Sequence, residues 1–298
     1  MASSLCITNE KLSLVCGSAS ARRIRVRDFA AATLPAGALI NGVITDERLF
    51  KQALDELREK LPKKALRDVK IALRTSQIYV KRMPVPKMPS RKLLEWIAGE
   101  FAGVAGGEEL LYDYALLERG REKGGQAALL CAVQRTLIEN LARFFAAEGV
   151  SIACIDTALS AQIKLMRLFK RTREGTYILL MMDGDGMDAS LYVNGAFRFS
   201  NSVRLLAERC TPESAAEISR QVSSIIQFNS SERSGQHVSN VYIAGLRPGE
   251  EGLIDTLQAS YDLEAGVLED AEGCIVPPPE RRLPLPDFAA ALGNLMDM

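Results

Sequence analysis

The sequence predicts an α/β protein of two domains, with a small α+β module inserted into the first domain. Three observations predict this organisation. Short strands and helices alternate in the first half, prolines interrupt it at residues 84, 86 and 89, and a strand–turn–strand unit opens the second half. A chain of 298 residues is long enough for two hydrophobic cores. We expect the first domain at residues 1–85 and 157–175, the inserted module at 86–156 and the second domain at 176–298.

The composition is that of an ordinary globular protein, with 47% hydrophobic and 25% charged residues. Lys plus Arg and Asp plus Glu number 37 each, so no net charge favours nucleic acid or an anionic membrane surface. Six scattered cysteines form no CxxC pair and no zinc spacing, which favours buried thiols in a reducing cytoplasm. The single histidine, His237, excludes catalytic or metal schemes that need two.

The sequence predicts no membrane anchor. No run approaches the ~18 apolar residues of a membrane-spanning helix. The N-terminal stretch is interrupted by Asn9, Glu10 and Lys11 and lacks the layout of a signal peptide. We therefore expect any association with a membrane to go through a partner protein.

The first half begins with strands and one amphipathic helix. Thr45 or Asp46 caps this helix, whose apolar residues lie on one face, and Pro62 ends it. The expected strands are residues 5–8, 11–16, 22–29, 69–73 and 78–83. The last two are expected to pair with each other around Arg74-Thr75-Ser76.

The proline-rich stretch at residues 84–89 marks the start of the inserted module, because such a stretch cannot lie in a central strand or a helix interior. Ser90 then caps a helix. Two strands follow at residues 110–118 and 126–133, and a second helix ends at Gly149. A strand at 150–155 completes a compact α+β unit.

The second half is organised around residues 176–201. Thr176–Met182 is a nearly unbroken apolar run, typical of a strand buried on both faces. Residues 183–186 form a sharp acidic turn, and Asn194-Gly195 indicates a tight hairpin. Thr211-Pro212 begins a helix. A strand at 238–244 and short helices at 250–260 and 287–295 follow.

The acidic turn is the strongest candidate site. Its carboxylates and glycines could hold Mg²⁺ or the phosphates of a nucleotide. The alternative is a solvated acidic turn that needs no ligand. The glycine that ends the strand at 238–244 has the same two interpretations, a nucleotide contact or a turn with positive φ. The candidate cofactor-binding residues are Asp183, Gly184, Asp185, Gly186, Asp188 and Gly245.

Five stretches of the chain follow one another in the order of a known family. They are Leu34–Asp46, Met83–Met88, Tyr112–Leu117, Gly149–Ala158 and Asp287–Gly293. In this order they resemble the PilM family of type IV pilus assembly proteins, a branch of the actin-like superfamily that is itself similar to FtsA. The resemblance is collinear over nearly the whole chain. It implies an actin-like (ribonuclease H-like) two-domain fold with an SHS2-like inserted subdomain.

Actin-like ATPases hold nucleotide with two phosphate loops and an adenosine loop, and the resemblance places the first phosphate loop at Ile7–Ser13. This stretch has no glycine, Thr8 stands where the family has aspartate, and Glu10 adds negative charge. The adenosine loop keeps Gly245, but residues 246–248 (Leu-Arg-Pro) are too bulky for a base to lie against the backbone.

The second phosphate loop is the acidic turn. It keeps Asp183, but Asp185 replaces the family's glycine and Ala189 its threonine. Together the three loops imply a chain that keeps the actin-like architecture, with at most a vestigial ATP and Mg²⁺ site, and has lost ordinary ATP hydrolysis. The resemblance therefore implies no catalytic residue, no metal ligand and no working cofactor.

The resemblance further implies a cytoplasmic scaffold of a type IV pilus, or of a related secretion or competence machine. Family members lie at the inner face of the cytoplasmic membrane. They bind the short cytoplasmic peptide of PilN, a single-pass inner-membrane protein, and other pilus platform proteins. We expect such a peptide in the groove between the first domain and the inserted module. The alternative is an active actin-like ATPase that binds Mg-ATP in the interdomain cleft. A sugar-kinase-like enzyme ranks last, because no candidate base is visible.

Overall fold

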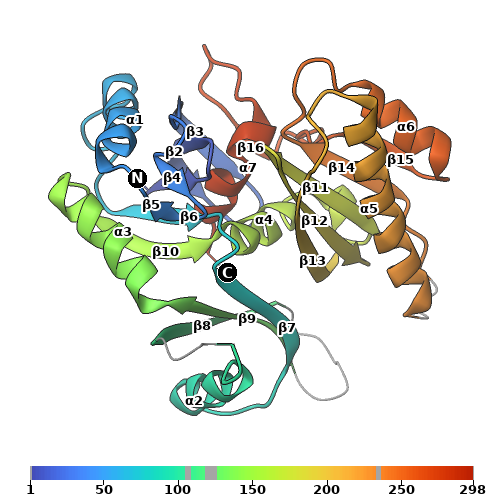
Figure 1. Ribbon diagram of the computed structural model, residues 1–298, viewed down its shortest axis with the longest axis horizontal. Helices are drawn as coiled ribbons and strands as arrows, with labels where there is room; N and C mark the ends of the chain where they lie inside the picture. Colours follow the sequence, from blue (N-terminus) through green and yellow to red (C-terminus); the bar gives the residue numbers. More distant parts are fainter. Residues whose placement is uncertain (1, 105–108, 118–125, 233–235, 298) are drawn as a thin grey trace.

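Two sheets with two helices between them form the body of the molecule, and a smaller sheet with its own helix lies below them (Figure 1). The computed structural model describes residues 2–104, 109–117, 126–232 and 236–297. We call the unit around the six-stranded sheet the first domain and the unit around the five-stranded sheet the second domain. The unit around the three-stranded sheet is the inserted module.

The first domain is built on a mixed sheet of order β10-β6-β1-β2-β3-β16. β1, β2 and β3 form antiparallel hairpins, whereas β6 is parallel to both β1 and β10. Two helices, α1 and α3, pack on the outer face, where the rings of Phe50 and Phe144 meet edge to face. The strands are β1 (Ala2–Ile7), β2 (Lys11–Ala19), β3 (Ile24–Thr33), β6 (Val69–Leu73), β10 (Ile152–Thr157) and β16 (Ile275–Val276). The helices are α1 (Glu47–Lys60) and α3 (Arg135–Ala147), and a small ladder joins β4 (Leu39–Ile40) to β5 (Val43–Ile44).

The second domain is built on a sheet of order β13-β12-β11-β14-β15. Its strands are β11 (Tyr177–Asp183), β12 (Gly186–Val193), β13 (Ala196–Arg204), β14 (Asn240–Ala244) and β15 (Glu264–Val267). The outer face is covered by α5 (Pro212–Ser231) and α6 (Gly252–Ser260). Within the described residues, no helix is both long and apolar enough to cross a membrane.

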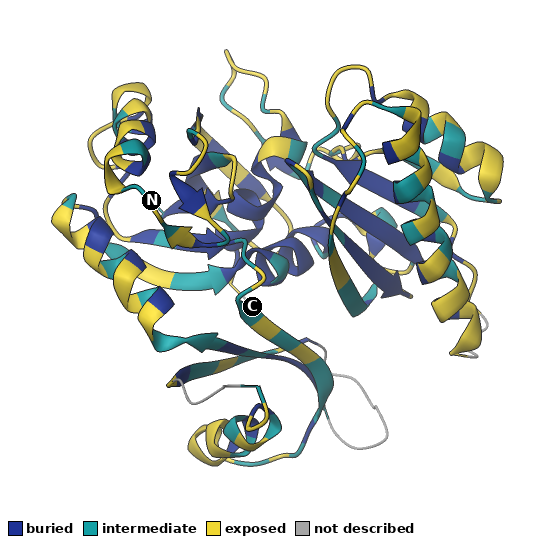
Figure 2. Ribbon diagram, in the orientation of Figure 1, coloured by how far each residue is buried: buried dark blue, intermediate teal, exposed yellow. Residues whose placement is uncertain are grey.

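Two helices, α4 (Ala158–Met166) and α7 (Leu285–Asn294), fill the space between the two sheets. Their side chains share one core with Val15 and Ile24 of the first sheet and Leu179 and Tyr192 of the second. Figure 2 shows both helices and the strands beside them as buried, while α1, α5 and α6 expose one side to solvent. The two domains are therefore joined by a continuous hydrophobic core.

The inserted module is a three-stranded sheet of order β7-β9-β8, covered by α2. Its elements are β7 (Ile78–Val85), α2 (Ser90–Glu100), β8 (Leu110–Leu116) and β9 (Gln126–Gln134). Pro84 lies inside β7, opposite Ala127. The sheet tolerates this proline because β7 is an edge strand, where a missing N–H leaves no ladder bond unmade.

The predicted caps at Asp46 and Thr211 and the hairpin turn are confirmed, but the cap at Ser90 is wrong, because Pro89 is the N-cap of α2 and no side chain caps that helix. The Asp46 side chain accepts a hydrogen bond from Leu49 N at 3.0 Å at the start of α1. Thr211 and Ser214 form a reciprocal capping box before α5. Asn194 has a φ of 51° and Gly195 a φ of 73°, as a tight hairpin turn requires. The α/β class is confirmed as well.

The prediction that residues 69–73 pair with residues 78–83 is wrong. β6 lies between β1 and β10, and β7 pairs with β9 in the other sheet. Local periodicity identifies a strand but carries no information about its partner. The chain leaves the first domain directly after β6.

The strand pairing also differs from the predicted division of the chain. β7 belongs to the sheet of the inserted module, while α3 and β10 belong to the first domain. β16 and α7, expected in the second domain, return to the first: Ile275 pairs with Ile24, and α7 contacts β1, β2 and β6. These elements lie far along the chain from their partners, so no short pattern in the sequence reports the pairing.

Candidate functional site

The two domains meet at two hairpin turns, one from each sheet. The β1–β2 turn brings Thr8 and Glu10 to residues 183–186 of the β11–β12 turn. Thr8 Oγ1 donates to Asp183 Oδ1 at 3.0 Å. The Glu10 carboxylate lies against Gly184, where an added Cβ would be 2.4 Å from Glu10 Oε1, and the φ of Gly184 is +56°. The positive φ favours glycine at this position, and a larger side chain would have to displace the Glu10 carboxylate.

The guanidinium of Arg74 lies between two of the predicted carboxylates. Arg74 directly follows β6, and its Nη1 is 3.0 Å from Asp183 Oδ2 while its Nε is 2.6 Å from Asp188 Oδ2. The side chains of Asp183, Asp188 and Arg74 are only 8%, 14% and 18% exposed. Burial acts to lower the pKa of Arg74, but Asp188 and Asp183 raise it above its ordinary value. An internal cation thus holds the two carboxylates together.

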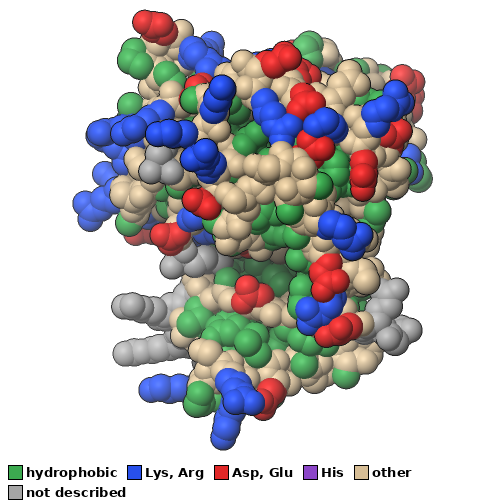
Figure 3. All heavy atoms as spheres, turned by 90° about the vertical axis from the view of Figure 1, so that its left-hand side faces the viewer, with side chains coloured by type: hydrophobic (Ala, Val, Ile, Leu, Met, Phe, Trp, Pro, Cys, Tyr) green, Lys and Arg blue, Asp and Glu red, His purple; other side chains and the backbone are tan. Residues whose placement is uncertain are grey.

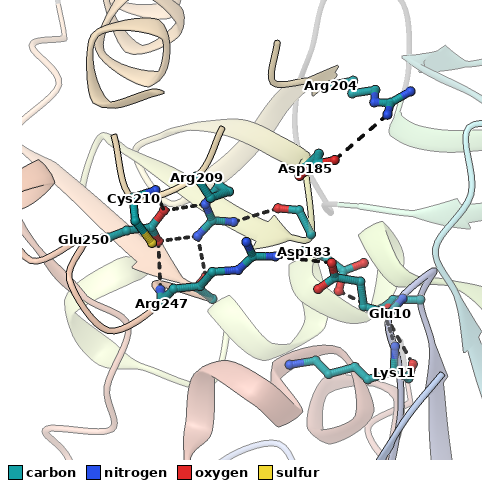
Figure 4. A network of polar contacts seen from close by, with 12 residues as sticks. Glu10, Lys11, Asp183, Asp185, Arg204, Arg209, Cys210, Arg247 and Glu250 are labelled. Atoms are coloured by element: carbon teal, nitrogen blue, oxygen red, sulfur yellow. Dashed lines mark hydrogen bonds and ion pairs between the residues drawn. The ribbon is translucent and has the colours of Figure 1, made fainter. Parts of the chain in front are cut away.

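A second buried arginine joins the acidic turn to the loop after β14. Arg209 forms a bidentate ion pair with Glu250, and the two side chains are 1% and 5% exposed. Arg209 also donates to Gly184 O at 2.8 Å and to Gly245 O at 3.1 Å (Figure 4). Burial acts to raise the pKa of Glu250, but Arg209 and the backbone N–H of Arg247 lower it below its ordinary value. Side chains of the protein itself therefore tie the two loops together.

Gly245 is explained by the backbone around it. Its φ is +82°, and an added Cβ would lie 2.0 Å from Met182 O, so no side chain fits at this crossing. Two positions later, Arg247 reaches the first domain, with its Nη2 at 3.3 Å from Glu10 Oε1 (Figure 4). The residues that join the two domains through polar contacts at the two turns and at Arg247 are called here the interdomain network. They are Thr8, Glu10, Arg74, Asp183, Asp188 and Arg247.

The structure brings most of the predicted site residues together. Gly186 lies against Arg74 between Asp183 and Asp188, and Arg209 connects Gly184 with Gly245. Asp185 is the exception, because its side chain is 58% exposed and lies 3.9 Å from Arg204, away from Asp183 (Figure 4). The three carboxylates do not converge. Across the described ranges, no group of three or more His, Cys, Asp or Glu side chains could hold a metal ion.

These contacts do not fit Mg-ATP. A phosphate cradle needs free backbone N–H groups in a glycine-bearing turn, but the first turn presents the carboxylate of Glu10 to Gly184. The carboxylates that could take part in holding Mg²⁺ are paired with Arg74. The carbonyl groups of both glycine-bearing loops accept from Arg209. The arrangement instead holds the domains in contact.

Sequence reasoning missed Arg74, Arg209 and Glu250. Charged residues in turns and loops are usually exposed, so none of them stood out. Their partners are distant in the sequence, since the residue numbers of Arg74 and Asp183 differ by 109 and those of Arg209 and Glu250 by 41. The one available signal was the place of Arg74, directly after a buried strand.

A groove with a volume of about 790 Å³ lies between α3 and the segment that contains β5 and the start of α1. It has an apolar floor and a charged rim, on which Lys51 and Glu148 form an ion pair. Figure 3 shows the side of the molecule that carries α1 and α3, with hydrophobic side chains exposed between groups of charged ones. The apolar lining residues are Val43, Ile44, Leu137, Leu141, Phe144 and Ala147, and the charged ones are Glu47, Arg48, Lys51, Arg143 and Glu148.

No protein-family model and no curated protein sequence matches the chain. Among solved structures, it is similar to the "PilM-PilN type IV pilus biogenesis complex", with a TM-score of 0.81 and 17% identity over 99% of this chain and 97% of that chain. An actin-like ATPase-fold protein of unknown function from Bacteroides thetaiotaomicron has a TM-score of 0.52 and 11% identity, over 90% of each chain. The cytoplasmic domain of EpsL, an inner membrane component of the Vibrio cholerae type II secretion system, has a TM-score of 0.51 and 12% identity, over 99% and 95%. The chain thus has the predicted actin-like fold, in the form found in the PilM-PilN complex.

Proposed function

We propose that the chain is a cytoplasmic actin-fold scaffold in the assembly platform of a type IV pilus, or of a related secretion or competence system. Its partner is a PilN-like single-pass inner-membrane protein, whose cytoplasmic N-terminal peptide it binds. The observation that carries this proposal is the TM-score of 0.81 with the PilM-PilN complex over 99% of the chain. The similarity to the EpsL domain supports the link to secretion systems. The scaffold stays at the membrane through this partner and contacts other platform proteins there.

The groove between β5 and α3 is the proposed binding site for the peptide. Its floor offers apolar contacts from the buried Leu137 and Phe144, its wall adds the exposed Val43, and its rim offers charged groups of both signs. A short peptide with alternating apolar and polar side chains matches such a surface, because apolar burial supplies affinity and the polar rim fixes orientation. The groove lies within the first domain, beside the point where α3 leaves the inserted module, and not between the first domain and that module as expected from the sequence.

We further propose that the scaffold works without hydrolysing ATP. Arg74 and Arg209 occupy the polar groups that face one another at the two turns, and Glu10 places negative charge beside them. Domain contact then depends on side chains of the chain and not on a bound nucleotide. This interpretation accounts for the loss of glycine and aspartate from the first turn.

Tagged protein mixed with detergent-solubilised membranes should recover a single-pass membrane protein with a short cytoplasmic N-terminal segment. Val43→Asp should reduce its recovery at least tenfold, since an unpaired charge in the groove is costly to bury under the peptide. Leu94→Asp is the matched control, because Leu94 and Val43 are both 36% exposed but Leu94 lies on α2, outside the groove. Recovery of soluble enzymes alone, or equal recovery by both variants, would contradict the proposal.

Millimolar Mg-ATP should leave the thermal unfolding midpoint unchanged. A ligand at 100 times its dissociation constant would raise the free energy of unfolding by about 2.7 kcal/mol, which is easily measured. The comparison is made with wild type and Asp183→Ala. A nucleotide-dependent rise in wild type that disappears in Asp183→Ala would support the active ATPase instead.

A further inference from the structure

We propose that the groove and the interdomain network are coupled, so that filling the groove shifts the balance between closed and more open arrangements of the two domains. The ligand in this proposal rests on the proposed function, but the coupling is a property of the chain alone. The residues that connect the two places are called the relay. They are Asn9, Asn41, Thr75, Ser76 and Gln77.

Residues 74–77 lead from the domain contact to the groove within four positions. Arg74 directs its side chain to Asp183 and Asp188 of the second domain. Gln77, three positions later, lines the groove. A displacement of this segment therefore acts on both places.

Asn41 fixes this segment to the groove wall. Its Oδ1 accepts from Ser76 N at 2.8 Å. Its backbone oxygen accepts from Thr75 Oγ1 at 2.6 Å and from Gln77 Nε2 at 3.0 Å. The next residue, Gly42, lines the groove and packs so closely on Thr75 that an added Cβ would be 2.9 Å from its side chain. The wall and the segment are thus one packed unit.

Asn41 reaches the interdomain network by a second route as well. Its backbone N–H donates to Asn9 Oδ1 at 2.8 Å. Asn9 lies in the β1–β2 turn between Thr8 and Glu10, both of which contact the second domain. The first domain contributes this turn and Arg74 to the interdomain network. Asn41 is therefore hydrogen-bonded both to the turn and to the residues that follow Arg74.

Gly42 and Val43, which directly follow Asn41, line the groove, so a peptide that fills it contacts them. It shifts the domain equilibrium only as far as its affinity differs between the two arrangements. Coupling between two sites of a protein typically changes affinity about 5- to 150-fold, and the change is reciprocal. Substitutions in the second domain that weaken the interdomain network should therefore change the stability of the groove wall.

The test is amide hydrogen exchange of the full chain carrying both Asp183→Asn and Asp188→Asn. These substitutions keep the side-chain shape and remove the charges that face Arg74. Exchange of residues 41–44 and 75–77 should rise about fivefold or more, although both substitutions lie in the other domain. Asp185→Asn is the control within the same turn, since this exposed carboxylate lies beside Arg204 and away from Arg74, and it should leave those amides unchanged.

A second variant tests whether the coupling passes through Asn41. Asn41→Gly removes the side chain and keeps a residue that tolerates the φ of 49°. In this background the Asp183/Asp188 pair should raise exchange at residues 42–44 less than it does in the wild-type background, because Asn41→Gly removes the Oδ1 contacts with residues 75–76 and keeps the backbone contacts of residue 41. Amides of α5 serve as an internal reference, because that helix lies on the far face of the second domain.

Faster exchange confined to residues 183–188 would overturn the coupling. An equal rise in α5 would also overturn it, because that result indicates general loosening. A synthetic copy of the cytoplasmic segment recovered in the capture experiment should change its dissociation constant about fivefold or more in the Asp183/Asp188 variant. If no segment is recovered, the proposed function fails, while the exchange measurement still decides the coupling.

Discussion

Replacing Arg209 with methionine should lower the free energy of unfolding by about 3–5 kcal/mol, measured by urea denaturation. The substitution leaves the carboxylate of Glu250 buried without its partner, and its side chain is only 5% exposed. It also leaves the carbonyl groups of Gly184 and Gly245 without the hydrogen bonds that Arg209 donates. Both loops belong to the second domain. The region around Gly184 and Gly245 should therefore unfold before the rest of that domain.

Arg204→Met is the matched control, since Arg204 is 82% exposed and should change stability by less than about 0.5 kcal/mol. The pH dependence gives a second check. The depressed pKa of Glu250 means that its stabilisation is present above the unfolded-state pKa and is lost as pH falls through the folded-state pKa. The free energy of unfolding of Arg209→Met should not show this loss as the pH falls. A variant as stable as wild type would contradict a structural role for the pair.

Gly293→Ala should destabilise the protein by about 3 kcal/mol, although alanine is the better helix former. Gly293 lies in α7, and an added Cβ would be 1.9 Å from Ala161 O and 2.7 Å from the carbonyl carbon of that residue in α4. The contact is with backbone, so the two helices must separate. Since α4 and α7 fill the space between the sheets, that separation disturbs the core shared by both domains.

The same substitution at Gly99 should have the opposite effect on stability. Gly99 lies in helix α2 with nothing within 4 Å of an added Cβ. Alanine should therefore stabilise the protein by about 0.5–1 kcal/mol. Thermal or urea unfolding of both variants checks the pair, and a stabilised Gly293→Ala would show that α4 and α7 pack less closely than described.

The elements that depend on neighbouring residues could be predicted from the sequence. Asp46, Thr211 and Asn194-Gly195 act on backbone groups a few positions away, so their caps and turn are visible in a short window. The actin-like fold was indicated by the order of the five stretches that resemble the PilM family. Strand partners were not predictable in this way, because β7 and β10 are placed by contacts far along the chain.

The sequence indicated where the candidate site lies, but not which side chains contact one another there. Asp183 and the glycines of the acidic turn do lie where the domains meet. Neither Arg74 nor Arg209 could be assigned to them, because an ion pair between distant positions has no local pattern. Asp185 was grouped with the other carboxylates by spacing, yet the turn directs it to solvent. In a hairpin turn, adjacent residues need not share one side.

The insertion of the small module also bears on how the chain folds. β6 and β10 are parallel neighbours, so Val69 meets Ile152 only after the long intervening segment has looped back. Within that segment Ile78 pairs with Val133, so a formed module brings its own two ends together. The entropic cost of loop closure rises by about 0.6 kcal/mol for each doubling of loop length. A module that forms early would thus shorten the effective loop and speed closure of the six-stranded sheet.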